Sequence, residues 1–217
     1  MKSNKNVFEI GMNSSEVIRN IVRYQRDIAA ITLVLHHVSI NWRQEHTDPS
    51  SQISNYKTSL HQVDPVRIRM VSREDVLSDL ETEIGKTKKS YENEHAVVSV
   101  ASRVNLVYGG IRHIPMMNFH PEIGHDQLRA VINFLREIGE KEGVILESGR
   151  YFHYYGNRLI SEREWIKFSA TFLKPVVLVS PRYIGQVFHN NYSTLRLTKD
   201  DTYKPRIPSV VHILQES

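Results

Sequence analysis

One short polar segment contains side chains that suit phosphate. Its residues are Ser148, Gly149, Arg150, Tyr151, Phe152 and His153. Glycine lets the backbone approach a ligand closely, serine offers a hydroxyl, and the planar guanidinium of arginine matches the geometry of phosphate. Alternate side chains of a strand share a face, so His153 should face the same way as Tyr155, and Arg150 the opposite way. The segment predicts a strand-turn-strand that holds a nucleotide or nucleic-acid phosphate, although turns between strands often contain these residues for structural reasons.

Composition limits the classes of protein to consider. The chain has 217 residues, 40% of them hydrophobic, which is enough for a sizeable core. It lacks cysteine, which excludes disulfides, thiolate zinc sites and cysteine nucleophiles, and favours a reducing cytoplasm. No apolar signal segment follows Met1, and no apolar run approaches the length of a membrane span, so we expect neither export nor membrane insertion.

The positive charge lies in the second part of the chain. Residues 1–95 contain 13 Lys and Arg against 13 Asp and Glu, whereas residues 96–217 contain 15 against 11, which accounts for the net charge of +4. A basic surface attracts polyanions through counterion release, so this distribution is compatible with a nucleic-acid partner.

The first part of the chain predicts mainly helices. Ser14 and Ser15 precede apolar residues at helical spacing that continue to Leu35, which predicts a capped core helix. Residues 44–63 are polar and predict a loop, and residues 72–85 predict a second helix with Ser72 as its cap. A charged connector over residues 86–94 suggests a boundary, and we expect a mainly helical N-terminal region at residues 1–95.

The second part, residues 96–217, predicts an α+β core. A hairpin is expected at Gly109 and Gly110, and helices are expected at residues 126–139 and from Ser161 to about Phe172. β-Branched and alternating runs predict strands at residues 96–100, 103–108, 111–119, 144–147, 151–155, 192–198 and 210–214. This order indicates an antiparallel sheet with helices packed on it.

Three segments in order resemble the archaeo-eukaryotic primase superfamily, which comprises primases and primase-polymerases. In that family an apolar strand ends in two aspartates one residue apart, a Ser-Gly turn carries a nucleotide-binding histidine, and an apolar run precedes a third acidic residue. Here the Ser-Gly turn and His153 match closely, and the stretch Arg-Tyr-Ile-Gly at residues 182–185 is similar to compact bacterial members. The resemblance covers about residues 96–213.

The chain departs from the family pattern at the metal-binding positions. Asn118 and His120 stand where the paired aspartates are expected, and Ser180 stands where the third carboxylate is expected. Two-metal phosphoryl transfer needs anionic oxygen ligands for magnesium, and an amide, an imidazole and a hydroxyl supply no negative charge. We therefore expect no cofactor and no polymerase activity by the family mechanism.

The resemblance implies a primase-like protein that binds DNA, RNA or a nucleoside triphosphate as a component of a replication or anti-phage defence system. The implied phosphate-binding residues are Ser148, Gly149, Arg150, His153, Arg182 and Arg196. We expect a catalytically inactive member of the family, in the cytoplasm.

Other interpretations remain open. An active nucleotidyltransferase could use magnesium or manganese on Glu122, Asp126 or Glu147. A softer metal could bind His120, Glu122, His125 and Asp126, although His125 and Asp126 lie where a helix is expected to begin and polar caps are usual. In a third alternative the fold is a scaffold, and the N-terminal region binds a protein partner.

Overall fold

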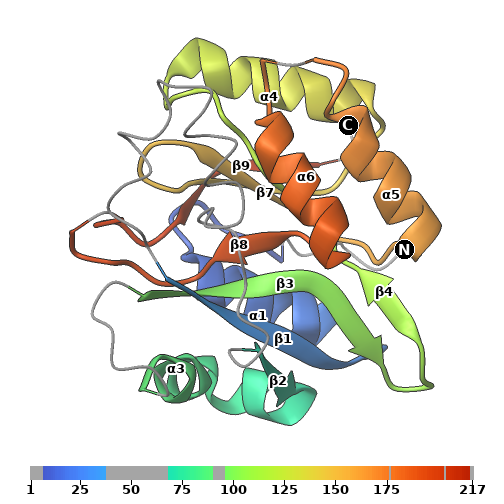
Figure 1. The fold of residues 1–217 in the computed structure, drawn as a ribbon, viewed down its shortest axis with the longest axis vertical. Helices are drawn as coiled ribbons and strands as arrows, with labels where there is room; N and C mark the ends of the chain where they lie inside the picture. The colour runs from blue at the N-terminus through green and yellow to red at the C-terminus, as the bar shows by residue number, and fades with distance from the viewer. Residues whose placement is uncertain (1–6, 38–67, 90–95, 176, 203, 216–217) are drawn as a thin grey trace.

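The computed structural model describes residues 7–37, 68–89, 96–175, 177–202 and 204–215. These residues form an α+β fold with two antiparallel sheets, which confirms the predicted fold class (Figure 1). The loop predicted at residues 44–63 lies outside the described residues. None of the helices described is long and apolar enough to cross a bilayer.

The first sheet contains strands from both parts of the chain. Its strands are β1 (Ile28–His37), β2 (Ile68–Ser72), β3 (Ala96–Leu106), β4 (Ile111–His113) and β8 (Thr194–Arg196). The order is β2-β1-β3-β4, and β8 also pairs with β3, with Val100 opposite Leu195. The long strand β3 thus connects the N-terminal strands to β8.

The second sheet holds the segment that suits phosphate. Its strands are β5 (Met116–Asn118), β6 (Gly143–Glu147), β7 (Phe152–Gly156) and β9 (Ser209–Leu214), in the order β5-β7-β6-β9. The register places Asn118 directly opposite His153. Residues directly opposite each other share a face of the sheet, so these two side chains are neighbours.

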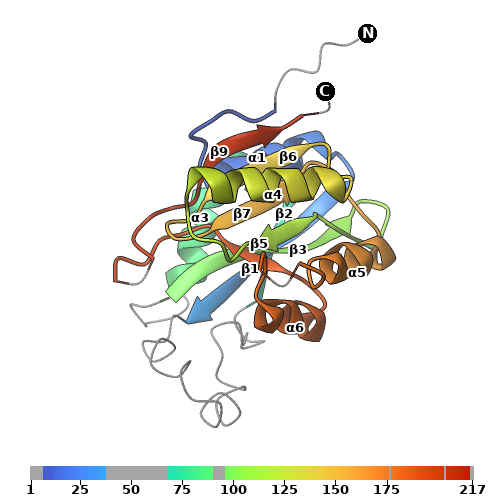
Figure 2. The same cartoon turned by 90° about the horizontal axis from the view of Figure 1, so that it is seen from above.

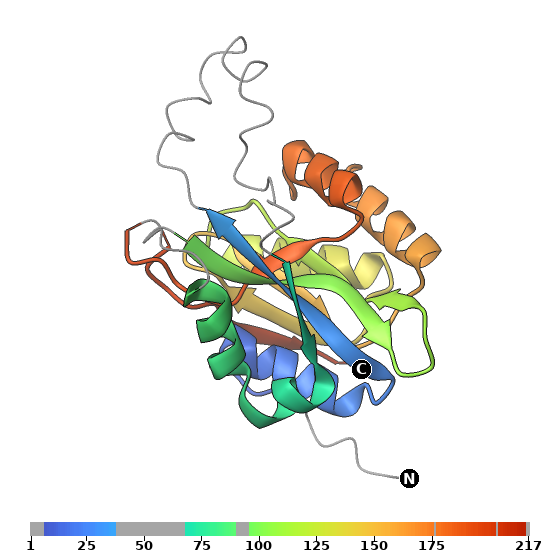
Figure 3. The same ribbon diagram turned by 60° about the horizontal axis from the view of Figure 1, so that its bottom comes forward.

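Helices pack against both sheets. They are α1 (Ser14–Tyr24), α3 (Arg73–Lys89), α4 (His125–Glu137), α5 (Glu162–Thr171) and α6 (Pro181–Asn190). Figure 2 shows α4, α5 and α6 on one side of the molecule, and Figure 3 shows α1 and α3 on the other. The first group packs on Phe152 and Tyr154 of β7, whereas Tyr155 belongs to a second core with α1 and the first sheet. The alternation predicted for β7 is therefore confirmed.

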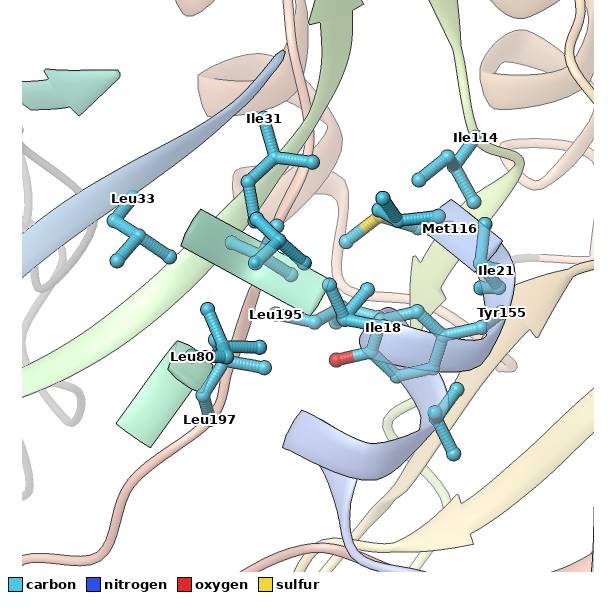
Figure 4. Packing of buried hydrophobic residues seen from close by; sticks show 14 of the residues in the cluster. Ile18, Ile21, Ile31, Leu33, Leu80, Ile114, Met116, Tyr155, Leu195 and Leu197 are labelled. Carbon is cyan, nitrogen blue, oxygen red and sulfur yellow. The ribbon is translucent and has the colours of Figure 1, made fainter. Parts of the chain in front are cut away.

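The core around Tyr155 joins both sheets to the N-terminal helices. Figure 4 shows Ile18 and Ile21 of α1, Met116 of β5 and Leu195 of β8 near the Tyr155 ring. All of these side chains are buried. The apolar stripe of α1 is thus part of the internal core, as predicted, and the stripe is not available to a partner.

The first predicted helix is wrong in its second half. Helix α1 ends at Tyr24, and the apolar run after it forms β1 rather than more helix. β1 lies between β2 and β3, and its four successive residues from Leu33 to His36 are all buried, so this part of the strand shows no alternation. A continuous apolar run does not distinguish a buried strand from a buried helix. The cap of α1 is Asn13, whose side chain accepts from the Glu16 amide, rather than a serine.

Two predicted strand patterns also differ from the structure. Residues 96–106 form one strand, β3, rather than two. The strand predicted at residues 111–119 is divided into β4 and β5, which belong to different sheets. Pro115 lies between them and has no N–H to continue a ladder, which explains the division.

The boundary predicted at residue 95 remains a prediction. Strands β1 and β2 share a sheet with β3, β4 and β8, so hydrogen bonds cross between the two parts of the chain.

Candidate functional site

The turn at residues 148–151 is closed by its own hydrogen bonds. The backbone N–H and the hydroxyl of Ser148 both donate to the carbonyl of Tyr151, each at 2.8 Å. Gly149 has φ +104°, a conformation that side chains disfavour. A β-carbon added there would lie 3.7 Å from Nη2 of Arg196. That distance is an ordinary van der Waals contact, so it is the positive φ of the turn that favours glycine here.

Polar atoms without partners gather on the inner face of the second sheet. Asn118 Oδ1, His153 Nδ1 and the hydroxyl oxygen of Tyr155 are buried and have no hydrogen-bond partner among the described residues. Asn118 and His153 are opposite each other, and Tyr155 follows His153 on the same face. Buried polar groups are nearly always paired in folded proteins, so these three atoms have hydrogen-bonding capacity that water or a ligand would satisfy.

Arg196 on β8 brings a positive charge to these atoms. Its side chain is buried, and it donates to the carbonyls of Thr198 (2.9 Å), Arg206 (2.5 Å) and Ser148. Burial lowers the pKa of the guanidinium to about 10, so it stays charged at neutral pH. Its described hydrogen bonds all go to backbone carbonyls rather than to a carboxylate. We name Asn118, His153, Tyr155 and Arg196 the inter-sheet cluster.

His153 is held in its neutral form. Burial lowers the pKa of the imidazole well below its ordinary value, and the positive charges of Arg196 and Lys204 lower it further. The charged groups that act on His153 are thus both cations. An anion placed beside the imidazole would be stabilised by both of them.

Tyr183 connects the cluster to helix α6. Burial raises the pKa of its hydroxyl, and a hydrogen bond from the Asn118 backbone lowers the pKa by a smaller amount. The hydroxyl also donates a long bond (3.5 Å) to the carbonyl of Thr194, two residues before Arg196 on β8. One side chain of α6 therefore positions both β5 and β8.

A second group of candidate residues lies on the surface beside the turn. Arg150 is exposed and forms an ion pair with Glu122, with Nε 2.9 Å from the carboxylate oxygen. The Arg150 guanidinium carbon lies 5.4 Å from the centre of the Tyr151 ring. That ring also stacks with His120 at a centroid separation of 5.0 Å. The structure therefore separates Arg150 from the inter-sheet cluster.

The candidates around Ser180 are at the beginning of α6. Ser180 is the N-cap residue of this helix, but its side chain makes no capping hydrogen bond. Arg182 lies in the first turn and is exposed. Of the predicted phosphate-binding residues, the structure brings together Ser148, His153 and Arg196, and it leaves Arg150 and Arg182 exposed.

The side chains at the family's metal positions do not suit magnesium. Asn118, His120 and Ser180 provide neutral donors, which do not fit magnesium. No three His, Asp or Glu side chains in the described part of the chain are placed to share a metal ion. The alternative carboxylates are also dispersed, because Glu122 pairs with Arg150, Glu147 pairs with Arg206, and Asp126 is exposed beside His125.

The neutral imidazole predicts a pH dependence of stability. The unfolded chain protonates His153 near pH 6.5, whereas the folded chain does not, because its pKa is lowered. The free energy of unfolding should therefore fall between pH 7 and pH 5, by about 2 kcal/mol from this group. Urea unfolding of the wild type and His153→Asn at both pH values would measure it. An unchanged difference between the two proteins at pH 5 and pH 7 would contradict the expectation.

Sequence reasoning missed two residues of the site. Tyr183 lies in the Arg-Tyr-Ile-Gly stretch, where Arg182 was predicted to bind phosphate. Nothing in that stretch indicated that the Tyr183 hydroxyl is turned inward. Lys204 is in a segment without periodicity, and its proximity to His153 comes from the connection between β8 and β9. The hydrogen bond from Arg196 to the Ser148 carbonyl, 48 residues away in the chain, likewise had no signal in the sequence.

Comparisons with known proteins support the resemblance. Residues 76–209 match the family described as archaeo-eukaryotic primase 1D-like, which is more than half of the chain. The match includes β3, the Ser-Gly turn, α6 and β8. No curated protein and no solved structure matches the chain. With the turn, His153 and Arg196 assembled between the sheets, the chain belongs to the archaeo-eukaryotic primase 1D-like family.

Proposed function

We propose that the protein binds a nucleotide or nucleic acid through phosphate at the inter-sheet cluster and does not transfer phosphoryl groups. The observation that carries the proposal is the buried guanidinium of Arg196 next to polar atoms that have no described partner. A buried positive charge is costly unless an anion or several hydrogen bonds compensate it. A phosphate oxygen would add to this compensation and would accept from the Tyr155 hydroxyl or the neutral imidazole.

The proposed loss of phosphoryl transfer follows from the donors at the former metal positions. Asn118, His120 and Ser180 supply no negative charge there, and the charges acting on the neighbouring His153 are positive. A second positive ion at this position would be repelled by Arg196, whereas carboxylates in active enzymes attract it. Family membership suggests a replication or anti-phage defence setting for this binding role.

Binding should depend strongly on His153. We expect His153→Gln to weaken binding of nucleotides or oligonucleotides by about 10- to 100-fold, the effect of losing one hydrogen bond to a charged group. Arg150→Gln should weaken it much less, because Arg150 is exposed and already paired with Glu122. Isothermal titration of the full chain with nucleoside phosphates, DNA and RNA measures both effects.

The comparison of His153→Gln with Arg150→Gln tests whether phosphate binds at the buried residues or at the surface residues. Arg163→Gln on α5 is a suitable control, because Arg163 is exposed and outside the cluster. Equal affinities of the wild type and His153→Gln for every ligand would contradict the proposal. Primer synthesis with added manganese that disappears on changing Glu122, Asp126 or Glu147 would favour the active enzyme instead.

A further inference from the structure

Two stacked rings lie on the surface beside the Ser-Gly turn, apart from the inter-sheet cluster. The imidazole of His120 and the ring of Tyr151 are nearly parallel, at 18°, with their centres 5.0 Å apart. His120 is exposed and Tyr151 is half-buried. The guanidinium carbon of Arg150 lies 5.4 Å from the centre of the Tyr151 ring. We name His120 and Tyr151 the surface ring pair.

Backbone hydrogen bonds hold the surface ring pair in place. The His120 N–H donates to the carbonyl of Leu178 (2.9 Å). The Ile123 N–H donates to the carbonyl of Arg150 (3.1 Å), the residue before Tyr151. The loop that carries His120 is thus tied to the turn that carries Tyr151. Side chains that are already ordered lose little conformational entropy on binding, so the surface ring pair is preorganised for a ligand.

The surroundings of the surface ring pair favour an uncharged ligand. Arg150 forms an ion pair with Glu122, whose side chain is 68% exposed. A phosphate placed here would be repelled by the carboxylate, and the guanidinium already has an anionic partner. Val177 precedes the residue that accepts from the His120 N–H, and it is 79% exposed, which adds apolar surface. The surface ring pair therefore suits a planar group without charge.

A nucleobase is the planar group that the proposed function brings to this place. Arg196 of the inter-sheet cluster donates to the Ser148 carbonyl, and the Ser148 N–H donates to the Tyr151 carbonyl (2.8 Å). One short turn thus contacts both the proposed phosphate site and the surface ring pair. Every base has a flat face that can stack on an aromatic ring. Bases inside a duplex are stacked on their neighbours, so an unpaired base is the one that is free to do so.

We infer that the surface ring pair stacks an unpaired base, and that the polynucleotide bound by the protein is single-stranded. The inference rests on the proposed function and deepens it, because it names the strand form of the ligand. Stacking uses the face of a base rather than its hydrogen-bonding edge, so we expect little dependence on sequence.

The test separates base stacking from phosphate binding with matched DNA ligands. The full chain is titrated, by fluorescence anisotropy, with a labelled single strand and with a blunt duplex of the same length. A third ligand is a strand in which abasic sites replace every base, so that all phosphates are kept. We expect the unmodified single strand to bind at least about tenfold more tightly than either of the others.

Ring variants locate the effect at the surface ring pair. Tyr151→Leu and His120→Leu each remove a ring but keep an apolar side chain, so each should weaken binding of the unmodified strand by about tenfold. Neither should change binding of the abasic strand. Tyr151→Phe keeps the ring and should bind as the wild type does. Tyr108→Leu is the control, because Tyr108 is 91% exposed in the turn between β3 and β4.

The outcomes distinguish this inference from the proposed function. Equal binding of the abasic and the unmodified strand would overturn the stacked base and leave phosphate binding in place. A duplex that binds as tightly as the single strand would also overturn it, as would a His120→Leu protein that binds the unmodified strand as the wild type does. His120 is exposed, so this variant tests the inference even if Tyr151→Leu does not fold. If no strand binds but nucleoside phosphates do, only the inference fails; if neither binds, the proposed function fails as well.

Discussion

Replacing Arg196 with leucine should lower the free energy of unfolding by about 3 kcal/mol and remove measurable phosphate binding. The guanidinium donates to the carbonyls of Ser148, Thr198 and Arg206, so its loss leaves these acceptors without their partner. Each buried acceptor left unpaired costs about 1–3 kcal/mol, and water at the exposed Arg206 reduces the sum. Urea unfolding and isothermal titration of the same preparation measure the two effects.

Arg196→Lys distinguishes the two roles of the side chain. Lysine keeps the positive charge, but it cannot reach three carbonyls with one planar group. We expect a stability between those of the wild type and the leucine variant, with part of the phosphate affinity retained. A leucine variant as stable as the wild type would show that Arg196 does not hold the Ser148 turn.

Gly143→Ala should be the most destabilising small substitution in the second sheet, by about 3 kcal/mol or more. A β-carbon at Gly143 would lie 2.5 Å from the Tyr155 carbonyl oxygen and 2.7 Å from the Tyr154 ring. The carbonyl belongs to the β6–β7 ladder and cannot move without breaking the pairing. The Tyr154 hydroxyl is fixed by a 2.8 Å bond to the buried Glu140 carboxylate, so the ring cannot move easily either.

Gly185→Ala is the matched control for this prediction. Gly185 lies in α6 with nothing within 4 Å of the added β-carbon. Alanine favours the helix there and should stabilise the protein by about 0.5–1 kcal/mol. Chemical denaturation of both variants measures the contrast, and a Gly143→Ala protein with wild-type stability would show that β6 and β7 can separate at this position.

The local features of the site were predictable, but their assembly was not. Strand alternation placed His153 and Tyr155 on one face, and the Ser-Gly turn was expected from its residue types. The pairing of Asn118 with His153 depends on the register between β5 and β7, which no local pattern specifies. The buried state of Arg196 depends on β8 joining β3, a contact between residues almost 100 positions apart.

The prediction failed most clearly where burial removed the periodic signal. Residues 28–35 are almost all apolar and residues 33–36 of β1 are all buried, and helical and strand spacing both fit such a run. Arg150 failed to join the cluster for a different reason. Arginine side chains often bind phosphate, but the Arg150 side chain pairs with Glu122, which is 28 residues away in the chain. The local sequence around Arg150 did not indicate this pairing.

The most direct test of the central claim is a crystal structure of the protein soaked with a nucleotide and manganese, with anomalous data to locate the metal. We predict density for a phosphate group in contact with Arg196 and His153, and no manganese at Asn118, His120 or Ser180. A manganese ion bound by any of these three residues, with a triphosphate attached to it, would contradict the account and would restore the protein to the catalytic members of its family.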